Sequence, residues 1–187
     1  LLKSNSVEMF KETAYINSNG NVTLESGKEL VCGSVIFAGG SKCVKNIKGS
    51  DSSNVIDTDE ALDLKEAPES LVIIGADYIG VEMAQIFSSF GSKVTVVERK
   101  DSAIEVIDSE VSSILIKSLE KSGIKFIFGK EITEISGEKV LAGSEEVASA
   151  KVILVTTREG DLTALKDVNL EISNGNVVAN EKMESSL

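Results

Sequence analysis

The stretch LVIIGADYIGVEMA, residues 71–84, decides the fold of this chain. Its four apolar residues end in a glycine, which is typical of a buried parallel strand, and an amphipathic helix follows within a few residues. Proteins that bind dinucleotides place the sequence G-x-G-x-x-G at such a turn. Here the three positions hold Gly75, Asp77 and Gly80, so an aspartate stands where the second glycine is expected.

The residues that follow this turn continue the same pattern. Buried strands are predicted at 94–97, 124–128 and 152–155, and helices at 81–90 and 109–122. Each helix stops at a glycine, as helices often do. Strands that alternate with helices imply right-handed crossovers and a parallel sheet. We therefore predict an α/β, Rossmann-like unit over residues 66–157.

The flanking segments predict mainly β structure. Short strands are expected at 7–16, 22–24 and 29–37, as in an antiparallel β-meander. The last of them ends in Val35–Ala38, expected to be a buried strand that runs into Gly39. Residues 45–57 are polar and are expected to be irregular. Shorter elements are expected at 59–64 (a helix), 132–141 (a hairpin), 147 (the start of an edge strand) and 170–178 (two strands around a turn).

The composition excludes several kinds of partner and chemistry. The chain has 187 residues and a formal net charge of −11, so it should repel nucleic acid and anionic membranes. It contains no apolar run long enough for a transmembrane helix. Histidine is absent, and Cys32 and Cys43 are isolated, so neither a zinc site nor a histidine base is expected. Isolated thiols favour a reducing compartment, and we expect the cytoplasm.

The turn itself has features that a pyrophosphate requires. The first glycine allows a sharp change of direction, and the third lets the helix pack closely on the strand. The helix N-terminus offers free N–H groups and a partial positive charge. Glu98 ends the next strand, about where a carboxylate that binds the ribose is expected. The alternative is an ordinary α/β turn with an acid there by chance.

Asp77 is the departure from this pattern, because it adds a side chain and a negative charge. Two like charges about 5 Å apart at an effective dielectric near 20 repel by roughly 3 kcal/mol. That energy corresponds to about two decades in affinity, so weakened binding is expected. Alternatively, Asp77 swings outward, binds a cation, or only caps the following helix.

Residues 60–111 resemble the pyridine nucleotide–disulfide oxidoreductases, a family that includes dihydrolipoamide dehydrogenase and glutathione reductase. VIFAGGSK at 35–42 looks like the strand that enters the family's A-T-G-S. VILVTTREGDL at 152–162 looks like the strand that enters G-R-x-P-N, and VVANEKMESSL at 177–187 looks like V-D-E-x-M-Q-T-S. The resemblance thus extends over nearly the whole chain.

The resemblance implies an FAD domain interrupted by an NAD(P) domain, followed by a dimerisation domain. On this basis residues 1–65 are a partial FAD-domain segment, 66–157 the NAD(P)-binding domain, and 158–187 the return to the FAD domain. The family's FAD fingerprint, C-x-x-x-x-C disulfide and C-terminal His–Glu pair are not found in the sequence. The chain is therefore expected to bind NAD(H), to contain no catalytic residue of its own, and to be inactive alone. FAD and a homodimer are expected only in the complete protein.

The resemblance also implies cofactor-binding residues. The pyrophosphate turn would comprise Gly75, Ala76, Asp77, Tyr78, Ile79 and Gly80. Tyr78 matches an aromatic residue that covers the flavin until nicotinamide displaces it. Glu82 matches a glutamate that pairs with a flavin-side lysine and meets the nicotinamide carboxamide. The alternative roles are packing at the helix start for Tyr78 and a favourable charge on the helix dipole for Glu82.

Coenzyme choice depends on the residues around Glu98, which matches the ribose-binding acid of members that use NAD. Arg99 and Lys100 stand where NADP-using members hold the 2′-phosphate, but the carboxylate favours NAD. An NADP-dependent, glutathione reductase-type enzyme therefore remains an alternative. So does a non-catalytic module that keeps the fold and has lost the site.

Three further residues match the A-T-G segment, and one matches the segment after the last strand of the nucleotide domain. Ala38, Gly39 and Gly40 align with A-T-G, so glycine replaces the threonine. Thr157 replaces the first glycine of G-R-x-P-N, near the expected nicotinamide. Asp77 and Thr157 thus both lie where the cofactor is expected to bind. Two changes at one place favour the alternative that cofactor binding has been lost.

Overall fold

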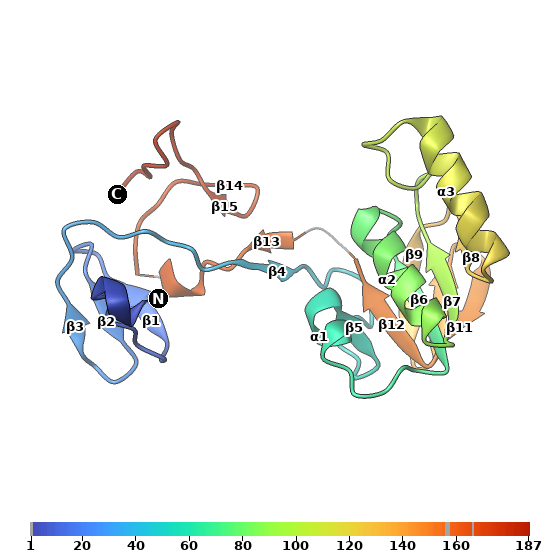
Figure 1. Cartoon of the computed structure of the whole chain (residues 1–187), viewed down its shortest axis with the longest axis horizontal. Coiled ribbons are helices and arrows are strands. Elements are labelled where there is room, and N and C mark those ends of the chain that lie inside the picture. Colours follow the sequence, from blue (N-terminus) through green and yellow to red (C-terminus); the bar gives the residue numbers. More distant parts are fainter. Residues whose placement is uncertain (1, 156–157, 166) are drawn as a thin grey trace. The chain divides into compact units, whose positions relative to one another are not determined.

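The computed structural model describes residues 2–155, 158–165 and 167–187, and the chain divides into two compact units (Figure 1). One unit comprises Leu1–Lys42 with Arg158–Leu187, and the other comprises Cys43–Thr157. The second unit therefore begins before residue 66, the predicted start of the nucleotide domain. The assignment of residues 1–65 and 158–187 to a flavin domain stays a prediction.

A parallel sheet forms the centre of the second unit, with five strands in the described part of the chain in the order β5-β12-β6-β7-β8. These strands are β5 (Val55–Asp57), β6 (Ser70–Ile74), β7 (Lys93–Val97), β8 (Lys125–Ile127) and β12 (Lys151–Leu154). Each neighbouring pair runs parallel. Helix α2 (Tyr78–Ser89) joins β6 to β7, and α3 (Ser109–Lys121) joins β7 to β8. The predicted α/β fold with a parallel sheet is confirmed.

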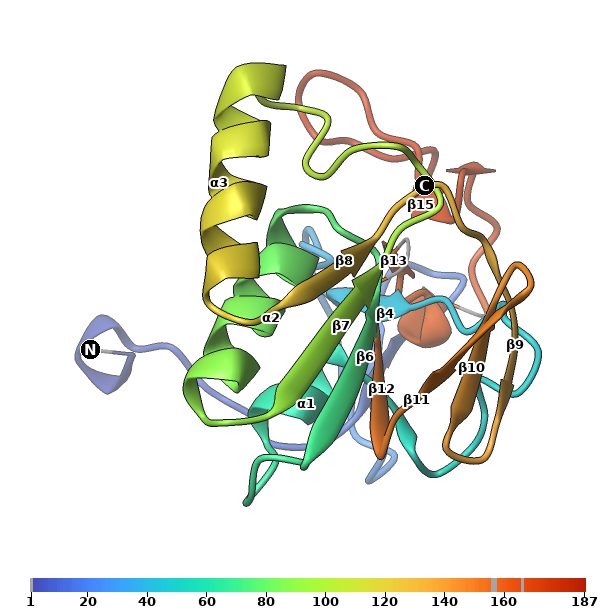
Figure 2. The same cartoon turned by 90° about the vertical axis from the view of Figure 1, so that its right-hand side faces the viewer.

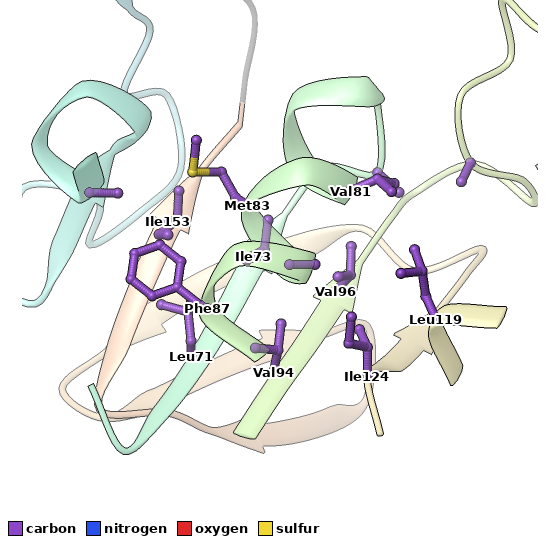
Figure 3. Packing of buried hydrophobic residues seen from close by; sticks show 14 of the residues in the cluster. Leu71, Ile73, Val81, Met83, Phe87, Val94, Val96, Leu119, Ile124 and Ile153 are labelled. Carbon is purple, nitrogen blue, oxygen red and sulfur yellow. The ribbon is translucent and has the colours of Figure 1, made fainter. Parts of the chain in front are cut away.

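Residues on β6 alternate between two cores, one on each face of the sheet. Leu71 and Ile73 pack in the cluster that includes residues of α2 and α3, as Figure 3 shows. Val72 and Ile74 pack in the opposite cluster. Burying an aliphatic side chain of this size stabilises a fold by about 1.5–3 kcal/mol. The apolar run of residues 71–74 is therefore a strand covered on both faces.

An antiparallel sheet of order β11-β10-β9 covers the face of the parallel sheet opposite α2 and α3, as Figure 2 shows. Its strands are β9 (Ile132–Ser136), β10 (Lys139–Ala142) and β11 (Glu145–Ala148). The predicted hairpin at 132–141 and the edge strand at Val147 are confirmed. Ile135 and Val140 are buried and pack against the sheet, so this layer replaces a helix.

The prediction that residues 45–57 are irregular is wrong at its end. Val55 and Ile56 are buried in β5, which pairs with β12 at one edge of the parallel sheet. The two apolar residues are too few to show a strand period, and their partner is distant in sequence. Helix α1 (Thr58–Leu62) follows directly, and Asp57 caps it in a capping box with Glu60.

The first unit contains the predicted β-meander, in the order β1-β2-β3. Its elements are η1 (Lys3–Asn5), β1 (Ala14–Ile16), β2 (Val22–Leu24), β3 (Glu29–Leu30), β13 (Arg158–Gly160), η2 (Thr163–Leu165), and the hairpin of β14 (Ile172–Ser173) and β15 (Asn176–Val177). Strand β4 (Ser41–Cys43), which pairs with β13, ends at the first residue of the second unit. The strands at 7–16 and 29–37 are shorter than predicted. Among the described residues, no helix is long and apolar enough to cross a membrane.

The predicted buried strand at Val35–Ala38 is wrong. Residues 31–40 form no strand, and Ile36 is 93% exposed. An apolar run becomes a buried strand only where neighbouring strands accept its backbone hydrogen bonds and cover its side chains. Within the described residues, no strand pairs with this segment.

Candidate functional site

The first glycine of the turn is required by the local backbone. Gly75 has a φ of +111°, which side chains with a Cβ rarely adopt. A Cβ there would lie 2.4 Å from the carbonyl oxygen of Val155, which is too close. The N–H of Gly75 donates to the carbonyl of Val97 at 2.9 Å, so the turn begins between two parallel strands.

The third glycine brings α2 close to the strand. A Cβ on Gly80 would lie 2.1 Å from the carbonyl oxygen of Gly75, so any larger residue would push the helix away. Gly75 and Gly80 therefore have the steric roles that the dinucleotide fingerprint assigns to them. Their contact with a cofactor stays a prediction.

Asp77 fits the turn without steric conflict, because its backbone is extended, with φ −73° and ψ −176°. Its side chain is exposed and caps α2, since Oδ1 accepts a hydrogen bond from the N–H of Gly80 at 3.0 Å. Of the roles considered for Asp77, the helix cap is the one with a contact in the structure. A cap of this kind contributes about 1 kcal/mol to stability. The cap also uses an N–H group at the helix N-terminus that a bound phosphate would otherwise accept a hydrogen bond from.

Glu98 lies at the end of β7 and faces the turn. Its Oε2 accepts a hydrogen bond from the N–H of Ala76 at 2.8 Å, and its Oε1 accepts one from the N–H of Lys100 at 3.0 Å. These two donors fix the half-buried carboxylate beside the glycine turn. Each oxygen keeps a further lone pair, so the carboxylate can still accept hydrogen bonds from a vicinal diol.

The loop after β7 holds the turn from the other side. The N–H of Ile104 donates to the carbonyl of Ala76 at 2.9 Å, so both polar atoms of Ala76 are bound. Ile104 is buried and has a φ of +46°, an outlier for a β-branched residue. Sequence reasoning missed Ile104, because an isoleucine gives no signal of a left-handed backbone.

Tyr78 and Glu82 lie one turn apart on α2, so they share a face of the helix. Both residues are exposed, and the exposed fraction of Tyr78 is 59%. Packing at the helix start therefore does not account for Tyr78. Ile79, by contrast, packs against the core between α2 and the sheet. The exposed pair is free to meet a ligand or another domain.

The basic residues after Glu98 differ in their surroundings. Arg99 and Lys100 are both exposed. The ammonium group of Lys100 forms an ion pair with the carboxylate of Glu105. Glu105 was not predicted from the sequence, because nothing in the local pattern shows that this loop folds back toward Lys100.

Residues 38–40, which match A-T-G, lead into β4, and the described residues of the G-R-x-P-N match begin with β13, which pairs with β4. The guanidinium of Arg158 donates to the carbonyl of Ser41 at 2.7 Å, and the N–H of Asp161 donates to the carbonyl of Gly40 at 3.0 Å. A Cβ on Gly39 would lie 2.4 Å from the ring of Phe37.

The pKa of Asp161 is lowered. The largest cause is the hydrogen bond that its carboxylate accepts from the hydroxyl of Thr163, and the bond from the backbone N–H of Thr163 is the next largest. Ala38, Gly39 and Gly40 are exposed. Thr157 lies outside the described residues.

The turn fits a dinucleotide in three respects and opposes it in one. Gly75 and Gly80 provide the close backbone approach, the N-terminus of α2 provides N–H donors, and Glu98 provides a fixed acceptor. The carboxylate of Asp77 accepts a hydrogen bond from the N–H of Gly80 and would repel a pyrophosphate there. Binding of a nucleotide at this turn, with weakened affinity, stays a prediction.

Comparison with known proteins places this site in a wider context. The family described as "Pyridine nucleotide-disulphide oxidoreductase" matches residues 1–187. Dihydrolipoyl dehydrogenase of Acholeplasma laidlawii is 31% identical over 100% of this chain and 58% of its own length. Soluble pyridine nucleotide transhydrogenase of Mycobacterium bovis (strain BCG / Pasteur 1173P2) is 32% identical over 73% of this chain and 31% of its own length. The chain thus spans between about a third and three fifths of these curated relatives.

Two solved structures share the fold. The HOCl-induced flavoprotein disulfide reductase RclA from Escherichia coli superposes with a TM-score of 0.87 and 21% identity, over 96% of this chain and 43% of that chain. The ferredoxin reductase for the CYP199A2 system from Rhodopseudomonas palustris gives a TM-score of 0.85 and 18% identity, over 99% of this chain and 50% of that chain. At such identities the likeness shows the fold alone.

Proposed function

The chain belongs to the pyridine nucleotide-disulphide oxidoreductase family, and on this basis we propose that it is the NAD(H)-binding portion of a dihydrolipoyl dehydrogenase-like flavoprotein. In this proposal residues 66–157 bind the nucleotide, and residues 1–65 and 158–187 belong to the FAD domain. The complete protein would hold FAD, form a homodimer and transfer hydride between nicotinamide and flavin. The chain by itself would bind NAD(H) without catalysing the disulfide reaction, in the cytoplasm and without a nucleic-acid or membrane partner.

The observation that carries the proposal is the position of Glu98. Its carboxylate is held beside the glycine turn by the N–H groups of Ala76 and Lys100. This is the place at which a carboxylate binds the ribose hydroxyls in dinucleotide-binding folds. A carboxylate needed only for charge or solubility would not require two backbone donors at the carboxyl end of a buried strand.

Each residue of the turn has a defined part in this proposal. The N–H groups at the start of α2 bind the pyrophosphate, and Glu98 accepts hydrogen bonds from the adenosine ribose. Tyr78 and Glu82 present an exposed face of α2 toward the nicotinamide and the flavin side. NAD, when bound, supplies the hydride chemistry, and the protein contributes binding and orientation.

Asp77 sets the affinity in this proposal. A pyrophosphate that reaches the N-terminus of α2 must displace the Asp77 carboxylate from the N–H of Gly80 or bind beside it. Either route costs free energy, on the order of 1–3 kcal/mol from a lost cap and like-charge repulsion. Binding of NADH is therefore expected to be weaker than at a turn with glycine in this position.

The test is a calorimetric titration of the full chain with NADH, alongside Asp77→Gly and Asp77→Asn. The glycine variant removes the cap and the charge, whereas the asparagine variant keeps a capping oxygen and removes only the charge. If charge dominates, both variants bind NADH about 10- to 100-fold more tightly than the parent. If the capping hydrogen bond dominates, only the glycine variant binds NADH more tightly than the parent.

The outcome also decides between the proposal and its main alternative. An alternative function is a non-catalytic module, which is favoured by the occupied N–H of Gly80. Absence of NADH binding in the parent and in both variants would support that module and contradict the proposed function. The NADP-dependent alternative predicts tighter binding of NADPH than of NADH in the same titrations.

A further inference from the structure

The carboxylate of Asp77 has one oxygen that the fold does not use. Its Oδ1 accepts the hydrogen bond from the N–H of Gly80, and within the described residues no hydrogen bond or ion pair engages Oδ2. The residue is exposed at the start of α2, so ions in solution reach it. We propose that Asp77 binds Mg²⁺ together with the pyrophosphate of the dinucleotide, so that the chain takes NADH as its Mg²⁺ complex. This inference rests on the proposed function, since it names the form of the ligand that the same site binds.

The turn keeps donors for a pyrophosphate while the cap of α2 is in place. Tyr78 and Ile79 are the first two residues of α2, and their backbone N–H groups have no acceptor within the described part of the chain. Free N–H groups at a helix N-terminus bind phosphate oxygens. A pyrophosphate can therefore bind to these two groups without displacing Asp77 from Gly80. The two anions then lie side by side.

No basic side chain of the turn or of α2 offsets this pair of anions. Residues 70–92, which include β6, the turn and α2, contain no lysine or arginine. In the next loop, the ammonium of Lys100 already pairs with Glu105. Glu98 adds a second carboxylate beside the turn. Adjacent like charges repel, and this repulsion lowers the affinity for the nucleotide unless a counter-ion lies between them.

Magnesium suits this arrangement of oxygen atoms. Mg²⁺ keeps several of its waters, and proteins usually hold it with one or two carboxylates and the phosphates of a substrate. The free Oδ2 of Asp77 would supply one ligand, the pyrophosphate would supply further oxygens, and water would complete the shell. Among the described residues, no three His, Cys, Asp or Glu side chains gather to hold a metal ion by themselves. The cation and the nucleotide are therefore expected to bind together.

Calorimetric titrations of the full chain with NADH test the proposal, in buffer with millimolar MgCl₂ and in buffer with EDTA at equal ionic strength. The parent chain is expected to bind NADH about tenfold more tightly with Mg²⁺, because the cation offsets the repulsion. Asp77→Asn keeps a capping oxygen but loses the charge, so its NADH affinity should differ by less than about twofold between the two buffers.

Two controls separate the role of Asp77 from general effects of the cation. Asp108 is also exposed and caps α3 through its Oδ1, so Asp108→Asn removes an equal charge from a matched position and should keep the Mg²⁺ response of the parent. Adenosine lacks the pyrophosphate and should bind the parent equally in both buffers. A Mg²⁺ response with adenosine would place the cation elsewhere and would overturn the inference.

The remaining outcomes distinguish this inference from the proposed function. An equal Mg²⁺ response in the parent and in Asp77→Asn would show that the cation acts without Asp77. An NADH affinity of the parent that is the same in both buffers, or NADH binding by Asp77→Gly and not by the parent with Mg²⁺, would also overturn the inference. In these cases NADH still binds and the proposed function stands. If neither the parent nor Asp77→Gly binds NADH in either buffer, the proposed function fails, and this inference with it.

Discussion

Two segments of this chain have nearly the same local sequence pattern and different structures. Residues 71–75 (LVIIG) and 35–39 (VIFAG) are both apolar runs that end in glycine. The first forms β6 between β12 and β7, and its side chains are buried. The second forms no strand, and Ile36 is almost fully exposed. The difference shows that an apolar run becomes a buried strand only where the remaining chain provides a strand to pair with its backbone and side chains to cover its faces.

The largest contrast should appear when isoleucine is truncated in each segment. Ile73 is fully buried, so Ile73→Ala should lower the free energy of unfolding by about 2–5 kcal/mol through lost burial and a cavity. Ile36→Ala should change it by less than about 0.5 kcal/mol, because the side chain is in solvent. Urea unfolding monitored by circular dichroism measures both. Equal losses in the two variants would show that residues 35–38 are buried in solution and would break the comparison.

A second contrast concerns glycine. Gly80→Ala places a Cβ 2.1 Å from the carbonyl oxygen of Gly75, so α2 must shift, and a loss of about 1–3 kcal/mol is expected. Gly33, in the segment without strands, would have no atom within 4 Å of a new Cβ and has no left-handed backbone.

Gly33→Ala is therefore the matched control and should be near neutral. Thermal unfolding compares the two variants, and the proposed function adds that Gly80→Ala weakens NADH binding whereas Gly33→Ala does not. A stable Gly80→Ala variant with unchanged NADH affinity would contradict the role of the close helix–strand approach.

The sequence predicted the second unit better than the first for a physical reason. Strands β6 and β7 and helices α2 and α3 carry their periods locally, and the pairs β6–β7 and β7–β8 form between residues within a few dozen positions of each other. Strand β5 was not predicted, because Val55 and Ile56 form a strand by pairing with β12, which lies far along the chain. The prediction for residues 35–38 was wrong for the opposite reason. The segment has the residue pattern of a buried strand, but no strand among the described residues pairs with it.

The residues of the candidate site also differ in whether the sequence alone could predict them. Glycine spacing and the acid at the end of the next strand could be predicted from residue types, and the structure places Glu98 beside Ala76. The contacts of Ile104 and Glu105 could not, because they depend on how a loop without a period folds back. The cap formed by Asp77 was one of several alternatives, and geometry was needed to choose it.

A smaller effect is expected at the cap itself. Asp77→Ala should destabilise the chain by about 1 kcal/mol, because the N–H of Gly80 loses its side-chain acceptor. Asp77→Asn should cost much less, since asparagine is an equally good N-cap residue. Thermal unfolding at neutral pH measures both. A loss in Asp77→Asn as large as in Asp77→Ala would mean that the charge, rather than the hydrogen bond, stabilises the start of α2.

The smallest effect lies in the first unit, in a local turn at residues 161–163. The pKa of Asp161 is lowered by the hydroxyl and then the backbone N–H of Thr163. Because the folded pKa lies below the unfolded one, this contact stabilises the chain above the unfolded pKa, and the stabilisation is lost as pH falls through the folded value. Thr163→Ala should raise the pKa of Asp161 part of the way back, since the backbone bond remains.

An NMR titration of the Asp161 carboxyl group measures this shift. Glu12 is an internal control in the same unit, since hydrogen bonds from Ser26 lower its pKa and no contact with Thr163 is involved. An unchanged Asp161 and an unchanged Glu12 would show that the turn at residues 161–163 is not formed in solution. A shift confined to Asp161 would show that this turn of the first unit is formed in solution, although within the described residues no strand pairs with the apolar segment at 35–38.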